Sequence, residues 1–222
     1  LAAAVFIPVK RMRTCLAKSE QSASLWLPLW FTGIGVGFIV LELVLFQKLV
    51  FYLGDPSRSL ALLLASLLIG SGVGSLITVK MRERGAVMAG AFSAAFAILI
   101  AFLLPMIFPA LQTASTGAKL SVAGALLVVQ GVPMGMMFPI GLRVAGRKFG
   151  PVAVPWVWAI NGAASVVGSA LTIIVAMAAG YNWSLALGVA SYVGAAFAAY
   201  QVTSSKVRSQ EQLAGKGQPL KS

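Results

Sequence analysis

The sequence predicts an all-α integral membrane protein, built as a bundle of six transmembrane helices. Three observations predict this class. Hydrophobic residues make up 59% of the 222 residues, charged residues make up only 10%, and the hydrophobic residues gather in six long segments. Soluble chains carry about 25% charged residues, so this composition excludes an ordinary soluble globule. Each segment has about the 20 residues that a helix needs to cross a bilayer.

The six segments are predicted to be helices because lipid offers no hydrogen bonds, and a helix satisfies its backbone within its own segment. A barrel would need strands of about ten residues with alternating polarity, which the sequence lacks. The connections are short and leave no room for an extramembrane domain. In order, we place the helices at residues 25–53, 58–79, 86–110, 118–143, 154–180 and 183–201.

The two ends of the chain differ from the membrane segments. Residues 1–24 start with an apolar stretch and then carry four basic residues, so we interpret them as a basic cytoplasmic lead-in that ends a longer upstream segment. Residues 202–222 are rich in Ser, Gln, Gly and Lys without an apolar period, which predicts a disordered cytoplasmic tail. The six-helix transmembrane domain then covers residues 25–201.

The basic residues predict the orientation of the bundle. The formal net charge is +12, and 14 of the 17 Lys and Arg residues fall in the lead-in, in alternate connections or in the tail. Lys48, Arg58 and Lys119 lie on the opposite side. The positive-inside rule therefore predicts a cytoplasmic (inner) membrane protein with both ends in the cytoplasm. The dispersal of the basic residues, without an aromatic platform, argues against nucleic acid as a partner and leaves the lipid bilayer.

The composition also excludes several kinds of catalytic and metal site. The chain has no histidine and a single cysteine. This rules out histidine-ligated haem, zinc sites that use histidine, catalytic sets that use histidine, and an internal disulfide. We therefore expect no cofactor, no metal and no catalytic residue in this chain.

Three polar residues inside the spans are the candidate binding residues. Glu42 lies in the middle of the first segment, where a carboxylate needs a partner, a proton or a cavity. It forms either a proton or cation site or a neutral acid that packs against a neighbouring helix. Gln130 and Asn161 lie in the fourth and fifth segments, and we expect the three side chains to face a shared polar interior that binds substrate or protons. The alternative for Asn161 is a hydrogen bond between helices.

Glycines at spacings typical of membrane helices predict close packing. Gly70 and Gly74 are four residues apart, and Gly162 and Gly168 lie in the small-residue stretch of the fifth segment. Gly70 to Ser75 read GSGVGS, which superficially resembles a phosphate-binding loop. The run has no preceding strand and no lysine at the required place, so we interpret it as a packing face.

Prolines and large interfacial residues complete the set. Pro133 and Pro139 each delete a backbone hydrogen bond, which predicts a kink, either for packing or for a substrate gate. Trp156 and Trp158 open the fifth segment and are typical of an interfacial aromatic belt. Arg143 ends the fourth segment and is expected to anchor it by reaching lipid head groups or by capping the C-terminus of that helix.

Four stretches occur in this order: GFIVLELVLFQKLVFYLGDP, SLALLLASLLIGSGVGS, GMMFPIGLR and PWVWAINGAASVVGS. Together, over about residues 30–200, they resemble the membrane region of the fused major-facilitator/spermidine-synthase-like family. The resemblance implies a bundle like half of a major-facilitator transporter, with two three-helix repeats of inverted topology. Family members commonly carry a soluble aminopropyltransferase domain that binds decarboxylated S-adenosylmethionine and a polyamine. This sequence lacks the Gly-rich strand–turn–helix of such a domain.

Three functions remain open on this basis. In the first, the chain is a non-catalytic, transporter-like membrane domain that needs a homodimer or another membrane subunit to enclose a pathway. In the second, it is a structural accessory subunit that packs through its glycine faces. In the third, it is the membrane anchor of an aminopropyltransferase-like enzyme. Polyamine transport, which the family name suggests, meets an objection. Polycations need several carboxylates, and the spans offer Glu42, with Asp55 only at an outer edge.

Overall fold

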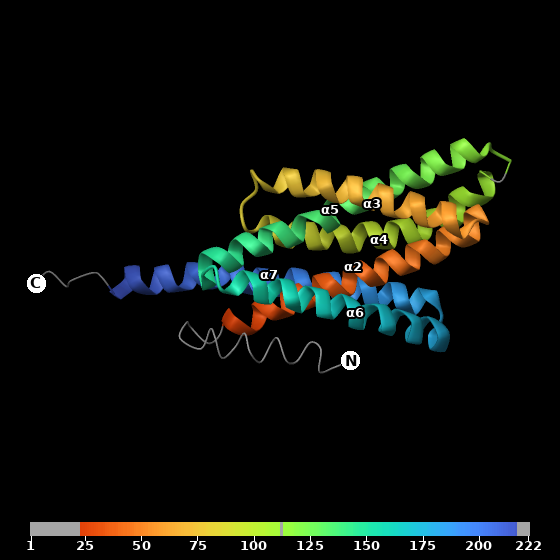
Figure 1. Cartoon of the computed structure of the whole chain (residues 1–222). Coiled ribbons are helices and arrows are strands. Elements are labelled where there is room, and N and C mark those ends of the chain that lie inside the picture. Colours follow the sequence, from red (N-terminus) through yellow and green to blue (C-terminus); the bar gives the residue numbers. More distant parts are fainter. Residues whose placement is uncertain (1–22, 112, 217–222) are drawn as a thin grey trace, which may run out of the picture.

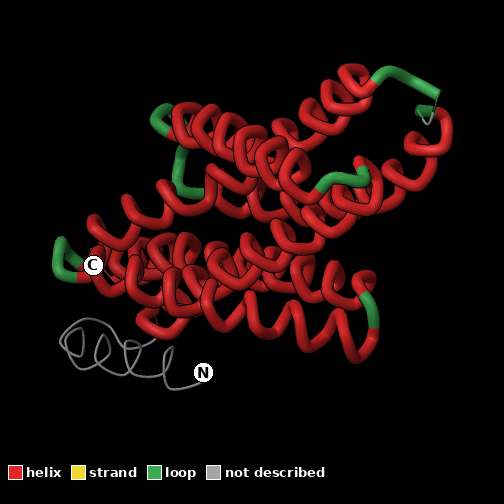
Figure 2. Tube along the Cα trace, turned by 45° about the vertical axis from the view of Figure 1, so that its right-hand side comes forward, coloured by secondary structure: helices red, strands yellow, loops and turns green. Residues whose placement is uncertain are grey.

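The computed structural model describes residues 23–111 and 113–216, and this part of the chain contains six helices and no strand (Figures 1 and 2). All six helices are long and apolar enough to cross a membrane. The predicted six-helix bundle of an integral membrane protein is therefore confirmed. The helices are α2 (Ala23–Leu53), α3 (Pro56–Thr78), α4 (Gly85–Ala110), α5 (Thr116–Phe149), α6 (Ala153–Ala179) and α7 (Tyr181–Lys216).

Two helices extend beyond their apolar segments. All six start within two residues of the predicted positions, but α5 continues from residue 143 to Phe149 and α7 continues from residue 201 to Lys216. The predicted domain boundary at residue 201 therefore falls inside a helix. Hydropathy marks where a chain leaves the apolar layer, whereas the helix ends where its backbone hydrogen bonds end. Most of the predicted lead-in (residues 1–22) and the last residues of the tail (217–222) lie outside the described residues.

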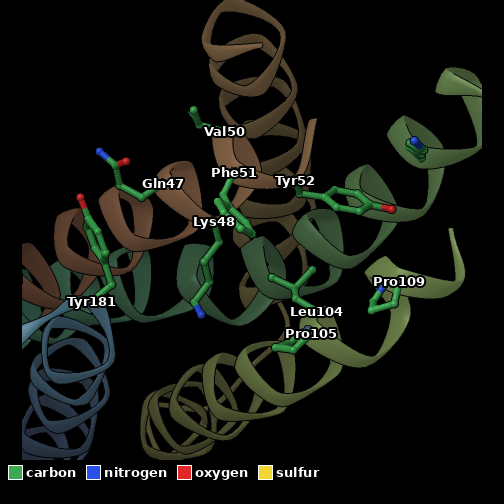
Figure 3. Close-up of a pocket in the computed structure, with 10 residues that line it drawn as sticks. Gln47, Lys48, Val50, Phe51, Tyr52, Leu104, Pro105, Pro109 and Tyr181 are labelled. Atoms are coloured by element: carbon green, nitrogen blue, oxygen red, sulfur yellow. The ribbon is translucent and has the colours of Figure 1, made fainter. Parts of the chain in front are cut away.

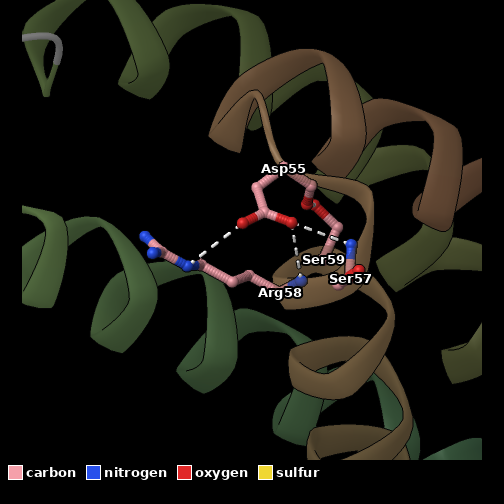
Figure 4. A network of polar contacts seen from close by, with 4 residues as sticks. All are labelled: Asp55, Ser57, Arg58 and Ser59. Atoms are coloured by element: carbon pink, nitrogen blue, oxygen red, sulfur yellow. Dashed lines mark hydrogen bonds and ion pairs between the residues drawn. The ribbon is translucent and has the colours of Figure 1, made fainter.

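A tight turn separates α2 from α3 (Figure 4). Gly54 adopts a φ of 71°, which glycine tolerates without steric cost. Asp55 then caps α3, because its Oδ1 accepts hydrogen bonds from the backbone N–H of Ser57 at 2.9 Å and of Arg58 at 3.2 Å. The Ser59 hydroxyl donates to the Asp55 carbonyl at 2.8 Å. The Asp55 carboxylate is thus engaged in a helix cap at the edge of the bundle.

The helices pair between the two halves of the chain. The α3 helix packs along α5, and α6 packs along α2, while α4 contacts both α5 and α7, and α7 contacts both α2 and α4. If α2, α3 and α4 are taken as equivalent to α5, α6 and α7, the α3–α5 pair corresponds to the α6–α2 pair. The α2–α7 pair then corresponds to the α5–α4 pair. The main contacts between helices are therefore those expected of two three-helix repeats. Because three is an odd number, the second repeat runs through the bundle in the opposite direction to the first.

The sequence carries the same repeat. Residues 70–78 of α3 read GSGVGSLIT, and residues 164–172 of α6 read ASVVGSALT, with five identical positions out of nine. The turn that precedes each of these helices contains a glycine of positive φ, at Gly54 (71°) and Gly150 (84°). The two segments therefore occupy equivalent places in the two repeats.

These equivalent segments make close contacts with helices of the other repeat. A Cβ atom added at Gly70 or Gly74 would collide with backbone carbonyl groups of α5. One added at Gly168 would lie 2.7 Å from Cγ2 of Ile39 and 3.0 Å from Cα of Val36, both in α2. The three glycines thus let helices of opposite repeats touch through their backbones, as the sequence predicts.

The sequence also assigns Gly162 to close packing and Pro133 and Pro139 to a kink. A Cβ atom added at Gly162 would meet no described atom within 4 Å, so the predicted close contact is not made there. Pro133 and Pro139 lie inside α5, which continues through both as one helix. Their missing N–H groups leave two α5 carbonyls without their usual partners, but they do not end the helix.

The bundle has a basic end and a far end. The basic end carries Arg82, Arg84, Arg143 and Arg147, and there the Arg147 guanidinium lies 4.0 Å from Oε1 of Glu83. The far end contains the α2–α3, α4–α5 and α6–α7 connections. Between the ends, most of the largest fully buried side chains come from α2 and α5, and they include Trp30, Phe31, Leu41, Met137 and Ile140. Large apolar side chains suited to lipid are exposed on α3, α4, α6 and α7.

Candidate functional site

A groove of about 490 Å³ lies between the α3–α5 helix pair and the α2–α6 helix pair. Its lining comes from α2, α3, α5 and α6. Apolar residues form most of the wall, but four polar side chains from the repeated segments and their neighbourhood enter it: Ser71, Ser75, Asn161 and Ser165. The groove is therefore an apolar hollow with a few placed hydrogen-bonding groups, which is the usual composition of a small-ligand site.

Asn161 brings an unsatisfied acceptor to the groove. Its Oδ1 atom is buried and has no hydrogen-bond partner among the described residues. Nearby, the Ser165 hydroxyl lies 3.0 Å from the Asn161 carbonyl oxygen and 3.1 Å from the Gly35 carbonyl oxygen, so it connects α6 to α2. A buried acceptor without a donor costs about 1–3 kcal/mol.

The α5 helix adds a backbone acceptor to the same hollow. Pro139 has no N–H to donate to the carbonyl of Gly135, four residues earlier, and both residues line the groove. Gly135 also approaches α3 closely, since an added Cβ atom would collide with the backbone of Ser71. The proline that the sequence assigns to a kink or gate thus leaves the Gly135 carbonyl without its usual helical donor.

Aromatic rings form one wall of the groove. Trp158 and Phe138 both line it, and their rings meet edge to face with centroids 4.7 Å apart. Trp158 is 56% exposed, and this exposed ring faces a site that the sequence did not assign to it. Trp156, the other predicted anchor, is partly buried and packs against the core.

Glu42 lies on the groove side of α2. Ile34 and Phe38 line the groove, and a spacing of four residues returns to the same helix face, so Glu42 lies one turn beyond Phe38 towards the far end. The side chain is half-buried. It makes no hydrogen bond or ion pair with another described residue. The acid therefore stands next to the groove without a partner in this part of the chain.

Gln130 does not join the other two candidates. It is fully buried, and its Nε2 donates to the carbonyl oxygen of Ser93 in α4 at 3.3 Å, while its Oε1 has no partner among the described residues. The α4 helix does not contribute to the groove lining. The structure therefore brings Asn161 and the Glu42 face to one side of the bundle and directs Gln130 to another, so the three residues do not share one interior.

Arg143 ties two helices together at the basic end. Its Nη2 donates to the carbonyl oxygen of Thr78 at 2.7 Å, and its Nη1 lies 3.4 Å from the Thr78 hydroxyl. Thr78 is the last residue of α3, so the guanidinium caps the C-terminus of that helix. The sequence suggests a cap on the helix that carries Arg143, whereas the structure shows the guanidinium at the end of α3, with α5 itself continuing to Phe149.

The groove lining includes an amide and three hydroxyls, all neutral, and the hydroxyls of Ser71 and Ser165 already donate to backbone carbonyl groups. Within the described ranges, no three His, Cys, Asp or Glu side chains lie together as a metal site would require. Comparison with protein-family models, with characterised proteins and with solved structures finds no match.

Proposed function

We propose that this chain is a transporter-like membrane domain, and that its groove face pairs with a second six-helix unit to enclose a pathway. The observation that carries the proposal is the groove itself, where Asn161 and three serines line a hollow between helices of opposite repeats. Transporters built from inverted repeats bind their substrates near the middle of the membrane, at the interface of the repeats.

Two further observations support the proposal. The contact pattern and the repeated motif of α3 and α6 describe a bundle of two three-helix repeats. The resemblance of four sequence stretches to the fused major-facilitator/spermidine-synthase-like family leads to the same architecture, with six helices as half of a transporter. We therefore infer that a second copy of the chain, or another membrane subunit, supplies the other half.

The accessory-subunit alternative loses its main argument. It requires glycine faces on the outside of the bundle to pack against other proteins, but Gly70, Gly74 and Gly168 are used inside the bundle. Gly72 and Gly162 have open space above them, and Gly72 lines the groove. Gly72, one of the glycines left on the surface, thus belongs to the groove face that we assign to pairing with a second six-helix unit.

Accessibility of the groove to water tests the proposal. In a Cys15→Ser background, we would introduce Ser71→Cys and Ser165→Cys in the groove, with Leu99→Cys on α4 as the control. Leu99 is 47% exposed and lies in the middle of a helix that does not line the groove. Thiosulfonate reagents attack thiolates, which form in water and not in lipid.

With a membrane-impermeant reagent on intact vesicles, both groove cysteines are expected to react at least about tenfold faster than Leu99→Cys. Equal, slow rates at all three positions would mean that water does not enter the groove, and the transport proposal would be abandoned. Oxidative cross-linking of Gly72→Cys in the same background tests the second copy. A dimer that forms with Gly72→Cys and not with Leu99→Cys supports a homodimer across the groove face.

A further inference from the structure

Glu42 is the only Asp or Glu within the six described membrane spans. Asp55 and Glu83 lie in connections between helices, where Asp55 caps α3 and Glu83 meets Arg147. Glu42 instead lies well inside the apolar span Leu25–Leu53. A carboxylate at that depth is costly, and such residues either pair with another group or mark an ion or proton pathway. The groups around Glu42 decide between these roles.

The packing of α2 against α6 shows what lies beside Glu42. Both helices run from the basic end to the far end, and the Ser165 hydroxyl of α6 lies 3.1 Å from the Gly35 carbonyl oxygen of α2. Two helical turns, about seven residues, lead along α2 from Gly35 to Glu42. The same step along α6 leads from Ser165 to Thr172. Glu42 is therefore level with Thr172, whose hydroxyl already donates to the Gly168 carbonyl oxygen at 2.7 Å.

The helices packed against α2 place no charged residue at this level. The α6 helix contains no titratable residue, and the basic residues of α3 and α5 lie near the ends of those helices. In α7, the Tyr192 ring lies against Gly37, on a different side of α2 from Glu42. The titratable residues in the spans packed against α2 are Arg58, Lys119, Arg143, Arg147, Lys148, Tyr181, Tyr192 and Tyr200.

The nearest basic residue on α2 itself is Lys48, six residues beyond Glu42. A step of six residues rises about 9 Å and turns about 120° around the helix, so the two side chains leave α2 in different directions. Figure 3 shows Lys48 in the wall of a separate cavity at the far end, together with Leu104 and Pro105 of α4. Among the residues that the structure describes, Glu42 thus has no hydrogen-bond or ion-pair partner.

A proton fits these surroundings better than a metal cation does. A cation such as Ca²⁺ takes about six to eight oxygen ligands, several of them from carboxylates. The described spans bring no second carboxylate to Glu42, and no cluster of three metal-ligating side chains occurs among the described residues. A proton needs a single oxygen atom, and its uptake removes a charge that is costly in apolar surroundings.

We propose that Glu42 is the proton site of the groove, an inference that rests on the proposed transport function. The side chain is half-buried and lies one turn beyond Phe38, which lines the groove. Water in an open groove stabilises the ionised carboxylate, whereas a closed, dry groove stabilises the protonated acid. A proton adds to one carboxylate oxygen and later leaves it, and no other bond forms or breaks. Each cycle of the groove then moves one proton with the solute.

Infrared spectroscopy of the full chain in liposomes tests the proposal, because the C=O stretch of a protonated carboxyl group is separate from the bands of carboxylates. The chain has five Asp and Glu residues in all, so few groups contribute. We expect a carboxyl band that disappears reversibly as the pH is raised from about 5 to about 9. Above its midpoint, the band should fall about tenfold for each pH unit, because one proton is exchanged. Glu42→Gln should lack this band.

Two further variants assign the band. Glu83→Gln is the matched control, since it removes a carboxyl group outside the spans and should leave the titrating band unchanged. Glu42→Asp keeps an acid at the position and should shift the band in frequency without deleting it, so the assignment does not depend on the glutamine variant alone. A Glu42 band that persists at the highest pH would indicate a permanently neutral packing acid. Its absence at the lowest pH would indicate a permanently ionised group, and either result would overturn the proposal.

The cysteine test of the groove keeps this proposal separate from the transport proposal, because it uses Ser71 and Ser165 and a different readout. Reactive groove cysteines together with a Glu42 band that does not titrate would overturn the proton site and leave the transport proposal in place. Unreactive groove cysteines would overturn the transport proposal, and with it the coupling of the proton to a solute, even if Glu42 titrates.

Discussion

Gly74→Ala should be the most damaging single methyl group that can be added to α3. The three atoms nearest to the added Cβ all belong to the backbone of Val132, and the carbonyl oxygen is the closest. No side-chain rotation can relieve this overlap, so α3 and α5 must separate. Overpacking of this kind costs about 3 kcal/mol, at the upper end of its usual range. Replacing a helical glycine by alanine returns about 1 kcal/mol, so we expect a net loss of about 2 kcal/mol.

Gly72→Ala is the matched control, two residues away on the same helix. An added Cβ atom there meets no described atom within 4 Å, so only the helix preference remains and stability should rise by about 0.5–1 kcal/mol. The assay is reversible unfolding of the purified chain in mixed detergent and dodecyl sulfate. The free energies of unfolding of the two variants should differ by about 3 kcal/mol, which is the loss of about 2 kcal/mol in Gly74→Ala added to the gain of about 1 kcal/mol in Gly72→Ala. If Gly74→Ala is as stable as Gly72→Ala, the backbone contact between α3 and α5 does not exist as described.

Three further predictions use the same unfolding assay. The free energy of unfolding of Gln130→Leu should lie within about 0.5 kcal/mol of the parent, because membrane hydrogen bonds contribute about 0.6 kcal/mol on average and the variant also removes an unpaired acceptor. Gln130→Ala leaves a cavity and should lose about 2 kcal/mol. A stable alanine variant would contradict the enclosed position of this side chain. Arg143→Gln should lose about 1–2 kcal/mol with its bonds to Thr78, whereas Arg147→Gln, whose ion pair is exposed, should lose less than about 0.5 kcal/mol; equal losses would argue against the helix cap. Glu42→Gln should change stability by less than about 0.5 kcal/mol while it abolishes substrate-coupled or proton-coupled uptake in proteoliposomes, and a large loss of stability would instead indicate a packing role.

Composition and hydropathy were sufficient to predict the six helices and their starts. They could not predict the end of α7, because residues after 201 are polar yet continue the helix to Lys216. A polar segment satisfies its backbone either in a helix or with water, and hydropathy does not distinguish the two.

The candidate site was predicted only in part, because the direction of a polar side chain depends on which helices pair. Asn161 and Gln130 are both amides inside apolar segments, and neither segment alone indicates that one faces the groove and the other faces Ser93. The repeat between residues 70–78 and 164–172 was a usable signal. Its recognition would have identified α3 and α6 as equivalent helices and Ser71 and Ser165 as members of one site.

The pairing of helices across the repeats also determines when the bundle can become stable during synthesis. The α3 helix enters the membrane before α5, its principal partner, and α2 enters before both α6 and α7. A nascent chain that stops after α4 therefore leaves the glycine backbone of α3 facing lipid, which forms no close contact with it. Among the described helices, α2 gains its contacts with α7 only when α7 arrives, so the bundle formed by these six helices stays incomplete until then.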